Sequence, residues 1–270
     1  MKRINVVLVS MIVVIVLSAG CNGSSNESSS NSAKSGKSKN EPGITITLQA
    51  EGEVGFKLNG EGTAVIDWGD GSPVESVEIR NISLKQNAQH TYAQASEYTI
   101  RVTGENIKDF LCDKLAISNL VVNVPTLEKL ICRGSEITSL DMSNCPQLRI
   151  LVLEYNEKLN SLNISKNSEL STMECCGSKQ ITGLDLSKNP ALGYFKCWGN
   201  KITSLDLSKN TKLVEAYCGI NEMSADALNA LLKSLHDNDV NAKKIISIAD
   251  NPGTDDCDKS IAENKGWIVR

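Results

Sequence analysis

Histidine, aromatic residues and clustered basic residues are all scarce in this sequence. Its 270 residues include two histidines, His90 and His236, and eleven aromatic residues (3 Trp, 5 Tyr and 3 Phe). The sequence offers no nucleophile beside a base, no carboxylate pair in a plausible cleft and no ligand spacing typical of a metal site. It therefore predicts a protein that is not an enzyme and that needs no metal or other cofactor.

The charge balance argues against another class of partner. The formal net charge of −4 becomes −6 when the two positive charges of Lys2 and Arg3 are removed with the first twenty residues. A mildly acidic chain without a Lys/Arg cluster lacks the basic surface that nucleic-acid binding requires. Because aromatic rings are few, each ring that the fold leaves exposed is a candidate ligand contact.

Residues 1–20 have the features of a secretion signal. A basic start precedes a nearly unbroken apolar run from Val6 to Leu17, which at about 12 residues is too short to span a membrane as a mature helix. The run ends in LSAGC, whose last residue is Cys21, and this ending resembles the lipobox of bacterial lipoproteins. The resemblance implies that Cys21 is acylated and becomes the mature N-terminus. The alternative is an ordinary signal peptide followed by a chance cysteine.

The lipobox resemblance also implies a location. Asn22 follows the cysteine where an aspartate would favour the inner membrane, so we expect an outer-membrane lipoprotein on the cell surface of a diderm bacterium. A periplasmic orientation stays open. Residues 21–42 are rich in Ser, Gly, Asn and Lys and hold no large apolar residue, so they predict a flexible tether that cannot bury a core.

Residues 43–104 predict a small antiparallel β-sandwich. Runs with strand-like alternation are separated by turn residues. These runs are 45–48, 56–58, 63–68, 77–79 and 98–102. The segments VIDWGDG (65–71), HTY (90–92) and EYTI (97–100) resemble the PKD-like immunoglobulin-type module of surface proteins. We interpret His90 as structural rather than catalytic or metal-binding, because the sequence offers it no partner histidines.

One phrase is repeated six times from Ile107 to Asn221. The copies begin at Ile107, Leu127, Leu148, Leu170, Leu192 and Leu213. A fixed period of about 21 residues predicts a solenoid, because one copy buries its apolar face only against its neighbours. Both halves of each copy fit L-x-x-L-x-L-x-x-N. This pattern resembles the nested leucine-rich repeats of bacterial surface proteins, over residues 105–221.

The leucine-rich repeat resemblance implies a parallel strand at each L-x-L and two internal ladders of asparagine. One ladder matches Asn144, Asn167, Asn189 and Asn210, and the other matches Asn156, Asn200 and Asn221. Buried asparagine is reasonable there, because backbone groups of turns inside a solenoid need hydrogen-bond partners.

Five of the six copies carry cysteine at their sixth position. The column reads Cys112, Cys132, Leu153, Cys175, Cys197 and Cys218, and its leucine indicates apolar side chains in a stacked core. A disulfide ladder is the alternative, although parallel strands about 4.8 Å apart give poor geometry for an S–S bond. Cys176 is expected to point away from the core as a candidate reactive thiol. The sequence predicts no place for Cys145 or Cys257.

The two faces of the predicted solenoid differ. One half of each copy repeats Asp141, Asn163, Asp185 and Asp206 outside the core, which suits a scaffold, with a calcium-binding row as the alternative. The other half varies, and strand alternation directs its third, fifth and seventh positions outward. We expect an exposed apolar stripe of Leu111, Ile131 and Val152.

The same alternation predicts a group of exposed rings. We expect Tyr194, Trp198 and Tyr217 to lie together near one end of the repeats, with Tyr155 near the middle. Exposed aromatic residues on a rigid sheet concentrate binding energy for proteins and for sugars. The predicted binding residues are Tyr194, Lys196, Trp198, Tyr217, Tyr155, Ile131 and Val152. The alternative is that a flanking element covers the rings.

Residues 222–270 predict an α/β cap that keeps the solenoid end soluble. Ser224 is suited to the N-cap of a first helix, and residues 243–248 read as a strand. We expect a second helix that is capped by Thr254, runs through Asn264 and is ended by Gly266.

The predicted fold class is a β-rich leucine-rich repeat solenoid with parallel strands, an α/β cap and an N-terminal antiparallel β-sandwich. The predicted function is binding or adhesion at the cell surface, with a protein or glycan ligand and a lipid anchor in the membrane. A structural or envelope-assembly component without its own ligand is the alternative. The ligand class rests on analogy with the fold.

Overall fold

The computed structural model of the chain describes residues 42–80, 87–239 and 242–270. The predicted signal, Cys21 and most of the predicted tether lie outside the described residues. Within the part that is described, no helix combines the length and the apolar character needed to cross a membrane.

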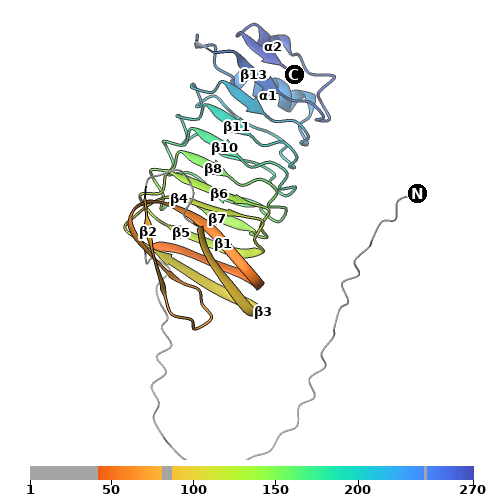
Figure 1. Cartoon of the computed structure of the whole chain (residues 1–270). Coiled ribbons are helices and arrows are strands. Elements are labelled where there is room, and N and C mark those ends of the chain that lie inside the picture. The colour runs from red at the N-terminus through yellow and green to blue at the C-terminus, as the bar shows by residue number, and fades with distance from the viewer. Residues whose placement is uncertain (1–41, 81–86, 240–241) are drawn as a thin grey trace, which may run out of the picture. The chain divides into compact units, whose positions relative to one another are not determined.

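A parallel β-solenoid carries most of the described strands (Figure 1). Eight parallel strands follow one another in chain order, each hydrogen-bonded to the next. They are β4 (Asn106–Asp113), β6 (Lys129–Arg133), β8 (Ile150–Val152), β10 (Thr172–Glu174), β11 (Tyr194–Lys196), β12 (Glu215–Tyr217), β13 (Lys244–Ser247) and β14 (Trp267–Val269). Each repeat contributes one strand to this parallel series, so the solenoid predicted from the repeat period is confirmed.

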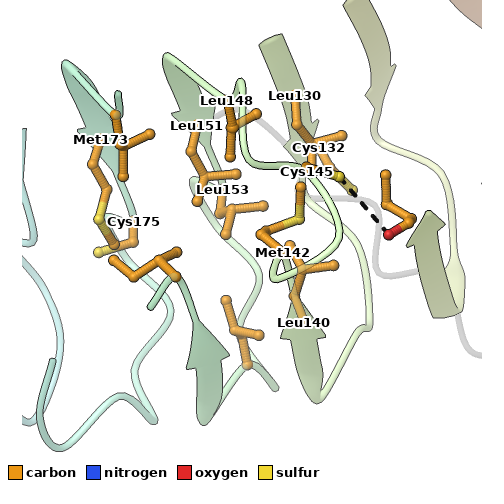
Figure 2. Close-up of a cluster of buried hydrophobic side chains, with 14 of the residues drawn as sticks. Leu130, Cys132, Leu140, Met142, Cys145, Leu148, Leu151, Leu153, Met173 and Cys175 are labelled. Atoms are coloured by element: carbon orange, nitrogen blue, oxygen red, sulfur yellow. Dashed lines mark hydrogen bonds between the residues drawn. The ribbon is translucent and has the colours of Figure 1, made fainter. Parts of the chain in front are cut away.

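The apolar columns of the repeat fill one continuous core (Figure 2). We call the sheet formed by these eight parallel strands the main sheet. Leu130, Leu151 and Met173 point inward from it and are fully buried. Leu140 and Met142 close the interior from the opposite side, where β7 (Ser139–Asp141) pairs in parallel with β9 (Ser161–Asn163). Full burial of such a side chain contributes about 1.5–3 kcal/mol to the stability of the fold. Each coil of the solenoid, meaning one repeat, is therefore stabilised by the coils on both sides.

The cysteine column lies inside this core, as predicted. Its five cysteines are buried free thiols, and Leu153 is buried at the same place in the third repeat. The Sγ atom of Cys132 lies 3.3 Å from the Oγ atom of Ser135. Burial raises the pKa of Cys175 well above its ordinary value, so its thiol stays protonated and packs as an apolar group.

Buried asparagines bind the turns of neighbouring coils together. The Nδ2 atom of Asn167 donates to the carbonyls of Met142 (3.0 Å) and Cys145 (2.6 Å). Asn189 and Asn210 repeat this arrangement one and two coils further on. The prediction that Asn144 begins this ladder is wrong. Asn144 is exposed, and Cys145 occupies the buried place instead, with its Sγ atom 3.8 Å from the carbonyl of Val122.

The second asparagine ladder runs along the opposite turns. Asn156 and Asn200 each donate from Nδ2 to two carbonyls, and Asn221 donates to three. This ladder extends into the C-terminal region, where Asn251 donates to the carbonyls of Cys218 (3.1 Å) and Ile248 (2.9 Å). The internal pattern of the repeat therefore continues past Asn221.

The strand β1 (Gly43–Asp67) organises the N-terminal residues by changing partner along its length. Its first residues pair antiparallel with β5 (Ile117–Asn123) and with β3 (Asn87–Thr103). Its later residues pair with β4 and then with β2 (Glu75–Ile79). The first three short runs predicted in this region therefore fall almost entirely within one long, bent strand. Because β4 and β5 belong to the first repeat, these strands share a sheet and a core with the solenoid.

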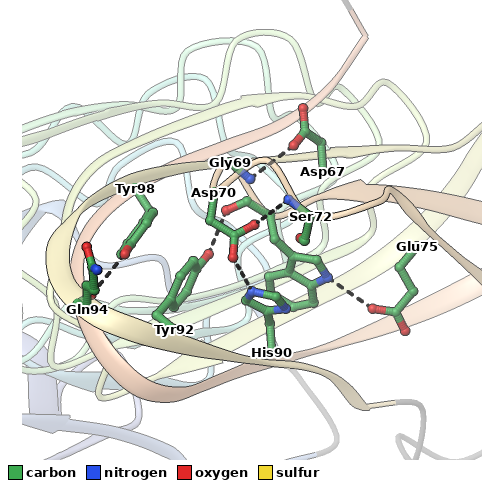
Figure 3. Close-up of polar contacts among 10 residues, drawn as sticks. Asp67, Gly69, Asp70, Ser72, Glu75, His90, Tyr92, Gln94 and Tyr98 are labelled. Atoms are coloured by element: carbon green, nitrogen blue, oxygen red, sulfur yellow. Dashed lines mark hydrogen bonds and ion pairs between the residues drawn. The ribbon is translucent and has the colours of Figure 1, made fainter.

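A polar cluster closes the turn after β1 (Figure 3). The Nε2 atom of His90 lies 2.7 Å from Oδ2 of Asp70, and the backbone N–H of Ser72 donates to Oδ1 of the same carboxylate at 3.0 Å. The His90 ring stacks on Trp68 with centroids 5.0 Å apart, and the Tyr92 hydroxyl donates to the Trp68 carbonyl. His90 therefore orders the turn, in agreement with its structural interpretation.

Two helices pack near the last strands. In α1 (Ala225–Ser234), the Ser224 side chain accepts a hydrogen bond from the backbone N–H of Ala227, which confirms the predicted N-cap. At the other end of α1, the Lys265 ammonium donates to the carbonyls of Lys233 (2.5 Å) and Leu235 (2.7 Å). A cation there also complements the helix dipole.

The second predicted helix is shorter than expected. The helix α2 spans Ser260–Glu263 rather than running from Thr254 through Asn264. Thr254 does not cap a helix, because its hydroxyl donates to the carbonyl of Ile248 and accepts from the backbone N–H of Asn251. The threonine thus stabilises the turn at Asn251.

Replacement of Asn167 by alanine should destabilise the solenoid. The change removes the two hydrogen bonds that Asn167 donates to the carbonyls of Met142 and Cys145, each worth about 0.5–1.5 kcal/mol, so we expect the free energy of unfolding to fall by about 1–3 kcal/mol. Urea unfolding followed by circular dichroism measures this. Asn144→Ala is the matched control and should change stability by less than about 0.5 kcal/mol. An equal loss in both variants would contradict the assignment of Cys145 to the ladder.

Stability should depend on pH through Asp70. Hydrogen bonding from Ser72 and then from His90 lowers the pKa of Asp70 below its ordinary value of 3.8. A lowered pKa stabilises the fold above the ordinary value, and this contribution is lost as the pH falls through the lowered pKa. We expect Asp70→Asn to lower the melting temperature near neutral pH, by a margin that shrinks below about pH 4. Asp255→Asn, at an exposed position, should show no such trend, and a margin independent of pH would contradict this account.

Candidate ligand-binding surface

The outward side of the main sheet carries the varied positions of the repeat, and part of it is closed. Ile131 is half-buried, but Val152 has only 4% of its surface exposed, so the prediction that Val152 is exposed is wrong. Charged pairs flank this stretch. The Nε atom of Arg133 lies 2.8 Å from Oε2 of Glu154, and its Nη1 atom lies 3.5 Å from Asp113. The predicted stripe is thus closed at Val152 and only half-buried at Ile131.

A tyrosine–lysine cluster lies on β11 and β12 and contains Tyr194, Lys196 and Tyr217. The two tyrosine rings have centroids 6.0 Å apart. The Lys196 ammonium lies 5.0 Å from the Tyr194 centroid and 5.7 Å from that of Tyr217, and 3.5 Å from a carboxylate oxygen of Glu174. Hydrogen bonding to Tyr194, with Glu174 close by, raises the pKa of Lys196. The cluster therefore presents a fixed cation between two half-buried rings.

A second aromatic group lies at the turns that follow the strands. Tyr155, Trp198 and Ile220 line a hollow of about 560 Å³, which we call the aromatic hollow. The rings of Tyr155 and Trp198 meet nearly edge to face, with centroids 6.2 Å apart and planes at 75°. Tyr155 and Ile220 each have 52% of their surface exposed. Gly177 and Gly199 lie between them in the lining of the hollow.

The aromatic hollow is built on a column of left-handed residues. The first residue of each such turn has positive φ, and the column reads Lys114 (58°), Gly134 (63°), Tyr155 (60°), Gly177 (65°), Gly199 (73°) and Ile220 (52°). This conformation turns the backbone N–H toward the next coil, where Tyr155 donates to the carbonyl of Cys176 at 2.8 Å. Glycine adopts it without penalty, whereas a branched residue such as isoleucine is a genuine outlier.

The glycines make the room. A Cβ atom at Gly177 would lie 3.0 Å from Cδ1 of Tyr155, so any side chain there would displace the ring. At Gly199 the nearest atoms to an added Cβ belong to Gly177. Tyr155 and Ile220 therefore lie at the two ends of the hollow. The two coils between them have glycine at this position and add no side chain to it.

Charged residues border the same hollow. Glu157, Lys179, Lys201 and Glu222 occur in four successive coils and belong to its lining. Glu157 and Lys179 form an ion pair, and the Lys201 ammonium lies 3.5 Å from the side-chain oxygen of Gln180. The aromatic hollow therefore has apolar walls and a charged rim whose charges sum to zero.

The structure distributes the predicted binding residues over two places. Tyr194, Lys196 and Tyr217 come together as predicted, while Trp198 packs against Tyr155. Ile220, Gly177, Gly199 and the rim residues were not predicted. The sequence does contain a sign of the hollow. The column that follows the strand reads Lys, Gly, Tyr, Gly, Gly and Ile from the first repeat to the last. Glycine in such a column indicates a left-handed turn and an interruption in the row of side chains.

Cys176 is not the exposed thiol that the sequence predicts. Its surface is fully buried although it lies outside the core cluster, so it is covered on the outward side of the sheet. Burial, then the nearby charge of Glu154, raises the pKa of Cys176 to about 12. Strand alternation does not reveal this, because it gives the direction of a side chain and not what lies over it.

Metal ligands do not gather in the part of the chain that is described. Within residues 42–80, 87–239 and 242–270, no three His, Cys, Asp or Glu side chains lie close enough to hold a metal ion. The recurring Asp141, Asp185 and Asp206 instead accept hydrogen bonds from the backbone N–H groups of the serines two residues further on.

Comparisons with known proteins give the following. No protein-family model and no curated protein sequence matches the chain. Among solved structures, the functional domain of InlJ from Listeria monocytogenes, described as including a cysteine ladder, is 26% identical; the match covers 46% of this chain and 28% of that chain, with a TM-score of 0.39. The internalin InlF from Listeria monocytogenes strain 4b F2365 is 16% identical, with 60% of each chain covered and a TM-score of 0.36. The chain thus matches less than two thirds of the length of either structure.

Thiol labelling should distinguish the cysteines. In the folded protein, we expect a maleimide to modify Cys257, which is half-buried, and to leave Cys176 and the core column unmodified. Mass spectrometry of the digested protein measures labelling at each site, and labelling in denaturant is the control in which every site should react. Rapid native labelling of the peptide that contains Cys176 would contradict its burial.

Proposed function

We propose that this protein is a lipid-anchored cell-surface protein that binds a protein or glycan ligand with the outward side of its repeats. The observation that carries the proposal is the aromatic hollow. Tyr155 and Ile220 adopt left-handed backbone conformations and present large, half-exposed side chains at its ends. Such conformations cost about 1–3 kcal/mol each and cluster at ligand sites, where the gain from binding selects them.

The tyrosine–lysine cluster supports the same proposal. Tyrosine rings supply large contact areas with little loss of side-chain entropy, and aromatic residues are enriched among the residues that dominate binding energy. Lys196 is held between the rings and Glu174, so a ligand meets a positive charge that is already oriented. Ile131 is half-buried on β6, three strands away from β11 in the same sheet, and can add apolar contact.

The rest of the proposal concerns how the surface is displayed. Acylated Cys21 anchors the chain in the outer membrane of a diderm bacterium, and residues 21–42 hold the folded part away from the lipid. Residues 43–104 act as a PKD-like sandwich that supports the first repeat, and residues 222–270 cap the last. The function is binding or adhesion rather than catalysis.

Protease treatment of intact cells tests the proposed location. We expect added protease to digest the full chain on intact cells, because the repeats are outside, and Cys21→Ser to release the protein from the membrane fraction. Lysed cells serve as the control in which digestion occurs in either orientation. Protection in intact cells would place the repeats in the periplasm and favour an envelope-assembly component instead.

Binding is tested with purified chain on arrays of proteins and glycans. We expect capture by at least one ligand class, and a loss of about tenfold or more when Lys196→Met or Tyr217→Ala disrupts the tyrosine–lysine cluster. Lys243→Met, at an exposed position near the C-terminal strands, is the matched control and should bind as wild type does. Capture that is unchanged in every variant of the outward surface would contradict the proposal.

A further inference from the structure

We propose that the aromatic hollow is a subsite for a neutral sugar, with room for a short oligosaccharide of pyranose rings. This inference rests on the proposed function and names the ligand class for one part of the surface. It follows from how apolar and charged groups are divided around the hollow.

The walls suit the apolar face of a pyranose ring. Trp198 and Tyr155 meet nearly edge to face and form a corner, and Ile220 closes the other end. Aromatic rings bury large areas of C–H surface and tolerate different ligands, because their faces need no matched hydrogen bond. The lining at Gly177 and Gly199 is also apolar to a ligand, since both backbone N–H groups are already bonded to carbonyls of the next coils.

The rim suits hydroxyl groups. Glu157, Lys179, Lys201 and Glu222 place carboxylates and ammoniums side by side on successive coils. An ammonium has three donors and a carboxylate only accepts, whereas a sugar hydroxyl both donates and accepts. Even the ion-paired Glu157 and Lys179 keep unused hydrogen-bonding capacity, because their side chains are more than half exposed, at 62% and 61%.

The same rim disfavours the main competing occupant, a purely apolar side chain of a partner protein. Such a side chain would remove water from four charged groups without replacing their hydrogen bonds, which is costly. A neutral sugar replaces them. An ionised sugar has no advantage, since the rim charges sum to zero and attract neither sign over distance.

The dimensions agree with this ligand class. The hollow has a volume of about 560 Å³, and volumes of roughly 300–1,000 Å³ are usual for small-molecule sites. Tyr155, Gly177, Gly199 and Ile220 belong to four successive coils. Three steps of about 4.8 Å make the hollow about 14 Å long, enough for a short oligosaccharide.

Tryptophan fluorescence gives a direct readout. The protein has three tryptophans, and Trp68 and Trp267 are each only 2% exposed. A change in tryptophan emission on addition of a ligand therefore reports on the indole of Trp198. The purified full chain is titrated with maltotriose, cellotriose, mannotriose, chitotriose and galactotriose. We expect at least one trisaccharide to change the Trp198 emission in a saturable way, and glucuronic acid to bind no more tightly than glucose.

Two variants separate binding from folding. Tyr155→Gly should weaken trisaccharide binding by about tenfold or more while the melting temperature stays the same or rises, because glycine relieves the left-handed conformation. Lys114→Gly makes the same backbone change in the first repeat, away from the hollow, and should bind as wild type does. Lys201→Met should weaken sugar binding, although it makes the hollow more apolar.

Three outcomes would overturn the inference. One is the absence of a saturable change with all five trisaccharides, and another is wild-type affinity in Tyr155→Gly. The third is a protein ligand that depends on Tyr155 and binds equally well or better to Lys201→Met, which would assign the hollow to an apolar side chain. In that last case the proposed binding function stands while the sugar subsite fails, so the two proposals are separated.

Discussion

Hydrogen bonding between successive coils is the constraint on which the rest of this structure depends. Each strand of the main sheet pairs in parallel with the next, and each turn is tied to its neighbour through backbone groups or a buried asparagine. A coil therefore lies in register over the one before it. Every position of the repeat becomes a column, and each internal column has one environment from the first repeat to the last.

This constraint explains why the internal columns are uniform and the outward ones are not. A column inside the core accepts leucine, isoleucine, methionine or cysteine, because each fills a similar space without a polar demand. A column in a turn accepts asparagine, because its amide donates a second hydrogen bond to each of two buried carbonyls. The outward columns have no such requirement, so sequence differences between repeats accumulate there and produce the tyrosine–lysine cluster and the aromatic hollow.

The same reasoning marks what the sequence reveals about the fold. The period of the repeat predicts the solenoid and the buried cysteines, since these follow from the equivalence of coils, and the resemblance to leucine-rich repeats implies the parallel strands and most asparagines of both ladders. Asn144 shows the limit. The repeat spacing that relates Asn167, Asn189 and Asn210 places Cys145 in the ladder, whereas a search for asparagine selects Asn144. The structure follows the spacing, because the position in the coil determines which side chain is buried.

The surface is less predictable for a physical reason. Strand alternation places Val152 and Cys176 outward, as it does Tyr194 and Tyr217, but exposure depends on the lengths of side chains on adjacent coils. The hollow depends on the absence of side chains at Gly177 and Gly199 and on positive φ at Tyr155 and Ile220. The bend of β1 across four partners likewise depends on tertiary pairing, which no local pattern contains.

The way β1 joins the first repeat has a mechanical consequence. The chain enters the folded part at Gly43, where the first residues of β1 are bonded to β5 on one side and to β3 on the other. If a ligand holds the repeats while the N-terminal segment is pulled, the tension passes into a strand with two antiparallel neighbours. The force is then shared by two rows of hydrogen bonds instead of opening one row pair by pair. When pulled from its N-terminal side, the folded part would therefore stay folded for longer because of this arrangement.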